Sequence, residues 1–202
     1  MPIIVNQGEK KEFILVPASV HQAVCYNVWE LGWQVSKSYD SGPADVKEKI
    51  VIGWEINEII PTGEFAGKRF TISKEYNKII YEKSNLSKDL VSWRGKPFTA
   101  EELEGFDLEK LIGVNCLLSV VHKARKSDGK VFANIVSVTN LPKGMMPLKP
   151  ENKRVTPKWI QFKIDNQVKD PEPAEPGAHV EAIAEAIAEA IAIEPDEDLP
   201  PF

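Results

Sequence analysis

Residues 47–60, KEKIVIGWEINEII, alternate between two kinds of side chain and decide how the chain is expected to fold. Ile50, Ile52, Trp54 and Ile56 occupy every second position, with valine, glycine and glutamate between them. Successive side chains of an extended chain point to opposite faces, so this pattern predicts a β-strand that is buried on one face only. Trp54 is expected on the buried face.

Four further segments have the β-branched and aromatic composition of strands. They read VHQAVCYNVWELG (20–32), KRFTISKEY (68–76), VNCLLSVVHKARK (114–126) and VFANIVSVTNLP (131–142). The turn PTGEFAG (61–67) and the dipeptide Asp128-Gly129 are expected to join consecutive strands into hairpins, because glycine in these positions suits tight turns.

Between the third and fourth strands the pattern becomes helical. Leu86, Leu90 and Trp93 have helical spacing, and Thr99 precedes Glu102 by three residues, as in a capping box. The chain is therefore expected to be mainly β, with a five-stranded OB-like Greek-key barrel and a helical insert between strands 3 and 4. A split sandwich is the alternative. A disordered acidic tail is expected after this body.

The charge is divided unevenly along the 202 residues. Residues 1–165 hold 24 Lys+Arg and 20 Asp+Glu, whereas residues 166–202 hold one Lys and ten acids. The predicted parts are an OB-like nucleic-acid-binding domain (1–165), a flexible acidic linker with an EAIA repeat (166–193) and an acidic partner-docking tip (194–202). The EAIA repeat is either a spacer that is partly helical or a weak self-association or docking stripe.

Few residues suggest chemistry. GEFAGKR has the wrong spacing for a phosphate-binding loop, and the three histidines and two cysteines lack the spacing of a metal site. The acids from Glu101 to Glu109 are expected to lie at helix ends. We expect no enzyme activity, cofactor or metal. The opening residues, MPIIVNQGEKKEF, lack the basic region followed by an apolar region that is typical of a signal peptide, and no apolar run is long enough to span a membrane. We therefore expect no membrane association and a cytoplasmic location.

Cations interleaved with aromatic residues are the main functional signal of the body. Single-stranded nucleic acid needs this combination, because bases stack on aromatic rings while Lys and Arg contact the phosphates. On an OB barrel such residues meet on the face of strands 2 and 3 and in the adjoining loops. The candidate DNA-binding residues are Trp33, Lys68, Arg69, Phe70, Lys74, Tyr76, Lys83, Lys88, Trp93, Arg94, Lys96, Phe98, Lys123, Arg125, Lys126 and Lys130.

The last nine residues, EPDEDLPPF, resemble the C-terminal tail of bacterial single-stranded DNA-binding proteins. In that family an acidic run ends in Asp, Ile, Pro and Phe and docks replication, recombination and repair enzymes. Pro200 is an extra residue relative to that pattern. The resemblance implies a partner-docking role for Asp196, Glu197, Asp198, Leu199, Pro200, Pro201 and Phe202.

The body resembles a family of phage-encoded proteins that bind single-stranded DNA. The resemblance is carried by HQAVCYNVWELGWQ, EKSNLSKDLVSWRGKPFTAEELEGFDLEKLIG and FANIVSVTNLPKG and covers most of residues 15–145. It implies an OB-like protein of phage replication and recombination, acting in the bacterial host cytoplasm. Homo-oligomerisation is left open.

Two other functions remain as alternatives. A recombination accessory protein or inhibitor would mimic the host docking peptide without binding DNA, and a nuclease would use acids between Glu101 and Asp107. Residues 146–165 are either a DNA-binding arm or a packed closing strand, with Lys153, Arg154, Lys158, Trp159 and Lys163 as the residues concerned.

Overall fold

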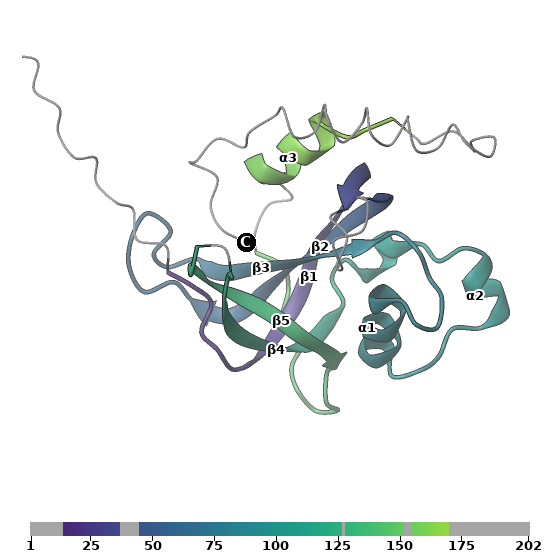
Figure 1. Ribbon diagram of the computed structural model, residues 1–202. Helices are drawn as coiled ribbons and strands as arrows, with labels where there is room; N and C mark the ends of the chain where they lie inside the picture. Colours follow the sequence, from purple (N-terminus) through teal and green to yellow (C-terminus); the bar gives the residue numbers. More distant parts are fainter. Residues whose placement is uncertain (1–13, 37–44, 127, 152–154, 170–202) are drawn as a thin grey trace, which may run out of the picture.

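The computed structural model describes residues 14–36, 45–126, 128–151 and 155–169 (Figure 1). Residues 170–193 of the predicted linker and the whole predicted tip, 194–202, lie outside the described residues. The fold is mainly β, as predicted. Its elements are β1 (Val20–Ser36), β2 (Asp45–Ile59), β3 (Arg69–Asn77), α1 (Asn85–Arg94), α2 (Ala100–Glu104), the 3₁₀ helix η1 (Leu108–Leu111), β4 (Asn115–Ala124), β5 (Val131–Asn140) and α3 (Lys158–Asp165).

The five strands form one antiparallel sheet in the order β3-β2-β1-β4-β5. The predicted closed barrel is therefore wrong for the described residues, because β3 and β5 are the two edges of an open sheet. Helix α1 contacts both edge strands. Its Leu86, Leu90 and Trp93 are buried in the core.

The main core lies on the face of the sheet that α1 covers. Ile50, Ile52, Trp54 and Ile56 of β2 are all at most 2% exposed and belong to this core, as the alternating pattern predicts. The Trp54 and Trp93 rings pack with their centroids 5.6 Å apart. The predicted core position of Trp54 is thus confirmed.

The opposite face of β2 is also buried, so the prediction of a half-buried strand is wrong. Every residue from Ile50 to Ile56 is buried, because α3 packs over Val51 through Ile160, which is fully buried. In Figure 1, α3 lies on one side of the sheet, apart from α1 and α2. At Gly53 a Cβ atom would lie 2.7 Å from the Trp29 ring and 2.9 Å from the Tyr26 ring, so this close packing requires glycine.

Residues 146–165 pack against the body. We call residues 146–151 the strap, and α3 follows it in sequence. The predicted closing strand is wrong, since residues 158–165 form a helix that packs against the body. The alternative, a DNA-binding arm, stays a prediction. Lys158 is exposed and Trp159 is half-buried, whereas Lys153 and Arg154 lie outside the described residues.

The predicted local signals for helices and turns are confirmed. The Ser84 side chain caps α1 by accepting from the Ser87 N–H, and Thr99 and Glu102 form the predicted capping box at α2. The Asp128-Gly129 turn joins β4 to β5 in a hairpin. None of the helices within the described residues has the length and apolar character needed to cross a membrane.

Candidate nucleic-acid interface

Three aromatic residues predicted to contact DNA lie in the core. Phe70, Tyr76 and Trp93 are 5%, 4% and 3% exposed, so none of them offers a ring face to a base in this structure. The Tyr76 hydroxyl donates to Asp89 Oδ2 at 2.7 Å. Burial, together with the Asp89 carboxylate, raises the pKa of Tyr76 well above its ordinary value. These three rings are structural.

Two of the predicted cations are also engaged inside the fold. Lys74 Nζ lies 2.6 Å from Asp89 Oδ2 and ties β3 to α1. Arg94 pairs with Glu102, and its guanidinium carbon lies 4.5 Å from the Phe98 ring centroid and 5.0 Å from that of Phe106. Since the Arg94 side chain is only 12% exposed, this cluster fastens the helical insert instead of presenting Arg94 and Phe98 to a ligand.

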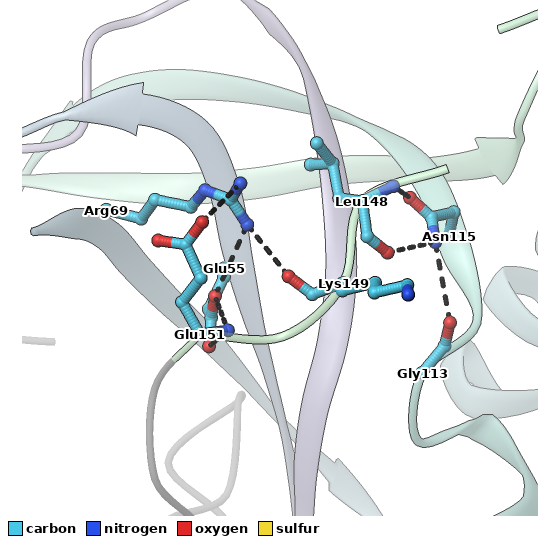
Figure 2. Close-up of polar contacts among 7 residues, drawn as sticks. All are labelled: Glu55, Arg69, Gly113, Asn115, Leu148, Lys149 and Glu151. Carbon is cyan, nitrogen blue, oxygen red and sulfur yellow. Dashed lines mark hydrogen bonds and ion pairs between the residues drawn. The ribbon is translucent and has the colours of Figure 1, made fainter. Parts of the chain in front are cut away.

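Arg69 holds the strap against the sheet (Figure 2). Its Nη1 donates to the Lys149 carbonyl at 2.9 Å, and its Nη2 lies 2.7 Å from Glu151 Oε1. The Asn115 side chain fixes the strap again, because it donates to the Leu148 carbonyl at 2.9 Å and accepts from the Leu148 N–H at 2.7 Å. The strap and α3 thus cover the outer face of β2, where a single strand was expected to lie.

Seven of the predicted cations are exposed and form no direct ion pair with a carboxylate of the described residues, although the pKa of Glu102 is lowered by the Thr99 N–H and, to a smaller extent, by nearby Lys96. Three of them lie in or beside the helical insert, and four lie at the two turns β2–β3 and β4–β5. The group at the insert is Lys83, Lys88 and Lys96, and the group at the turns is Lys68, Lys123, Lys126 and Lys130. Arg125 accompanies the second group but pairs with Asp128 at 3.3 Å.

The sheet topology brings the two turns to one end of the molecule. In this antiparallel order, β2 and β4 finish at the same end at which β1, β3 and β5 begin. Figure 1 shows both turns at that end of the sheet, on the left. Residues 16–21 connect them, since His122 Nε2 contacts the Val16 carbonyl at 2.8 Å and His21 Nδ1 lies 2.8 Å from Glu58 Oε1.

An exposed aromatic ring completes this group. Phe65 is 49% exposed in the β2–β3 turn, and Lys68 Nζ lies 5.3 Å from its ring centroid. The sequence interpretation used residues 61–67 only as a turn and missed Phe65, although an aromatic residue in a polar turn beside lysines is itself a signal. We call Phe65, Lys68, Lys123, Lys126 and Lys130 the hairpin end.

Two other aromatic residues, Trp33 and Tyr81, lie away from the hairpin end. Trp33 is half-buried near the other end of β1, and its carbonyl accepts from the Val168 N–H at 3.0 Å. Tyr81 is 51% exposed in the β3–α1 connection, and the sequence interpretation missed it as well. Its signal is an aromatic residue in the polar stretch before α1, two positions from Lys83.

The acids considered for a nuclease have local structural roles. Glu102 completes the capping box of α2, and Asp107 accepts from the Glu109 N–H at 3.0 Å at the start of η1. Within the part of the chain that the structure describes, no three His, Cys, Asp or Glu side chains come together as a metal site. No protein-family model matches the chain, and no curated protein matches it in sequence.

Proposed function

We propose that this protein binds single-stranded DNA without sequence preference and recruits replication, recombination and repair enzymes through its acidic C-terminal tip. The observation that carries the proposal is the hairpin end. There four lysines without carboxylate partners among the described residues accompany the exposed ring of Phe65. Lysines attract phosphates, and an exposed ring accepts any base, because every base has an aromatic face.

The fold supports an OB-type assignment within this proposal. OB domains are five-stranded, partly open barrels. The sheet here has five antiparallel strands with β3 and β5 at its edges, and α1, between β3 and β4 in sequence, contacts both. We propose that residues 1–169 act as the OB-like body, because Asn166 and Val168 are attached to it, with residues 170–193 as the linker and residues 194–202 as the docking tip. The proposed place of action is the bacterial host cytoplasm during phage replication or recombination.

The proposed contacts differ from those of a typical OB protein in one respect. Because the strap and α3 cover the outer face of β2, the strand is held at the hairpin end instead of across the middle of the sheet. Four lysine–phosphate contacts predict a slope of about −3 when log affinity is plotted against log salt concentration.

The test is fluorescence anisotropy of a labelled oligothymidylate and a matched duplex, at about 50 mM and 200 mM salt. We expect the single strand to bind more tightly than the duplex. The double variant Lys126→Ala, Lys130→Ala should weaken binding and reduce the salt slope by about 1.5, which is half of its value. Lys110→Ala, Lys143→Ala removes the same charge from two other exposed lysines and serves as the control. Equal affinity for both DNA forms, or equal effects of both double variants, contradicts the proposal.

One observation favours a second function. The usual nucleic-acid surface of an OB barrel includes the face of β2 that is covered here. A protein that acts only through its tip does not need this surface, so its loss would not impair such a protein. Such a recombination accessory protein or inhibitor would capture partner enzymes through residues 194–202 but give no anisotropy change with oligothymidylate at either salt concentration.

A further inference from the structure

A hollow of about 220 Å³ lies at the edge of β3, away from the hairpin end. It is bounded by the last residues of β3, by the β3–α1 connection and by the start of α1. Its lining includes two cations, one aromatic ring and two amides, from Lys49, Lys83, Tyr81, Asn77 and Asn85. Sites for drug-sized molecules usually measure about 300–1,000 Å³, so this hollow suits a smaller unit such as one base with its sugar.

Tyr81 is presented to the hollow from a fixed backbone. The Tyr81 N–H donates to Ser84 Oγ at 3.4 Å, and the Ser84 N–H donates to the Tyr81 carbonyl at 2.9 Å. The Tyr81 ring has no ring or cation contact within the described ranges, and it is 51% exposed. Ile79, another lining residue, is 53% exposed. An apolar surface of this kind, held in place before binding, reduces the entropy lost when a flat ligand docks.

The charges around the hollow favour an anion. Glu75 is its acidic lining residue, and Lys49 and Lys163 hold its carboxylate at 2.7 and 2.5 Å. Burial acts to raise the pKa of Glu75, but these two ammonium groups outweigh it and keep the pKa below its ordinary value. Two cations on one carboxylate leave an excess positive charge. Lys83 adds a further cation that has no carboxylate partner in the described part of the chain.

We propose that this hollow holds one nucleotide of a bound single strand, with its base against Tyr81 and Ile79 and its phosphate beside Lys83. The amides of Asn77 and Asn85 supply donors and acceptors for the base edge or the sugar. A duplex is excluded because its bases are stacked and paired and do not turn out into a hollow of this size without the cost of unpairing. This inference rests on the proposed DNA binding and assigns it a second contact region.

The direct test is photo-cross-linking of the full chain to an oligothymidylate that carries 5-iododeoxyuridine, followed by peptide mapping. Iodouracil cross-links to aromatic rings on which it stacks, so the cross-linked peptide should contain Tyr81. The cross-link at this peptide should disappear in Tyr81→Ala and persist in Tyr81→Phe, which keeps the ring. Cross-links confined to other peptides in the native chain overturn the inference.

Affinity gives the second measurement. Loss of one base–aromatic stack predicts binding weaker by roughly 5- to 100-fold for Tyr81→Ala. Tyr81→Phe should stay close to the native affinity, and Lys83→Ala should reduce the salt slope by about 1. Leu103→Ala is the matched control, since Leu103 on α2 is also an exposed large side chain, at 52%, and does not line the hollow. Thermal melting of each variant checks that the fold is retained.

The outcomes separate this inference from the proposed function. If the native chain binds oligothymidylate and Tyr81→Ala binds equally well, the nucleotide site is wrong and DNA binding stands. If the native chain binds no oligothymidylate, both are wrong. Competition by thymidine monophosphate gives a third measurement. If it competes for the Tyr81 cross-link at the same concentration as the oligonucleotide, the hollow serves a free nucleotide and the strand site is overturned.

Discussion

The backbone N–H of Glu151 donates to both carboxylate oxygens of Glu55, at 2.9 Å and 3.2 Å. Glu55 is fully buried in the middle of β2, and Arg69 Nη1 lies 3.8 Å from its Oε2. A carboxylate inside a sheet is costly unless it is paired and hydrogen-bonded. Glu55 therefore joins the strap to the sheet, and its removal should loosen both.

Glu55→Ala should lower the free energy of unfolding by about 2–4 kcal/mol, because it leaves the Glu151 N–H without its acceptor and removes a buried carboxylate beside the Arg69 guanidinium. Glu55→Gln should cost less, since the amide oxygen still accepts from Glu151. Urea denaturation measures both changes. Asn57→Ala, at an exposed position of the same strand, is the control, and a Glu55→Ala midpoint equal to that of the control contradicts the prediction.

Gly53→Ala should lower the free energy of unfolding by about 1–3 kcal/mol, because overpacking displaces the rings of Trp29 and Tyr26. Gly105→Ala is a matched control. Gly105 also has an extended backbone, with φ −174°, and an added Cβ meets no atom within 4 Å. Thermal melting should show a lower Tm for Gly53→Ala only, with a change in near-UV circular dichroism from Trp29. Equal Tm values for both variants would show that the rings adjust without cost.

Glu75 should make the stability of the fold depend on pH in the acidic range. Its folded pKa is held below the ordinary value of 4.5, so above that pH its ionised form stabilises the fold, and this contribution is lost as pH falls through the lower folded pKa. Urea midpoints of the native chain and Glu75→Gln, measured between neutral pH and about pH 3, should converge on the acidic side. A constant difference between them across that range excludes the predicted role.

The hairpin end and the hollow predict a dependence on oligonucleotide length. They lie at opposite ends of β3, whose nine residues span about 30 Å. At the 3.4 Å rise of one DNA strand this distance corresponds to about nine nucleotides, and to fewer if the strand is stretched. Affinity should therefore increase steeply up to about this length and slowly beyond it, and Tyr81→Ala should reduce the steep part. A length dependence identical in both proteins argues against a strand that spans both regions.

The acidic tail should compete with DNA for the body. Residues 166–202 hold ten acids and one Lys, so a tail tethered to a basic body shares space with the strand at high local concentration. Deletion of residues 194–202 should tighten oligothymidylate binding at low salt and abolish capture of partner enzymes. Phe202→Ala, which keeps every acid, should abolish capture alone. If the deletion leaves the affinity for oligothymidylate unchanged at low salt, the tail does not compete with DNA.

Local patterns in the sequence predict much of the fold. The strand at residues 50–56 with its core positions, the Asp128-Gly129 turn and the Thr99–Glu102 capping box each depend on a few neighbouring residues, and the structure confirms each of them. Closure of the barrel depends on whether β3 pairs with β5, which are far apart in sequence, and no local pattern encodes that pairing. The second buried face of β2 likewise depends on Ile160, more than a hundred residues away.

The candidate site is less predictable for a related reason. Phe70, Ile72 and Tyr76 alternate along β3 as core residues do, and this signal for burial was given less weight than the lysines between and beside them. Exposure of Phe65 and Tyr81 depends on how two connections fold over the sheet edge, which residue types alone do not determine. Composition therefore identifies the kind of ligand better than the residues that contact it.

The contacts at the C-terminal end of α3 determine where the chain can be truncated. Asn166 donates twice to the Phe162 carbonyl, from its backbone N–H at 3.0 Å and from its side chain at 2.8 Å. Two residues later Val168 forms a bridge with Trp33 on β1. A fragment cut at residue 165 would lose both of these contacts at the end of α3. A tail-free body for binding measurements should therefore end at Lys169, so that a loss of affinity reports on DNA contacts and not on a frayed helix.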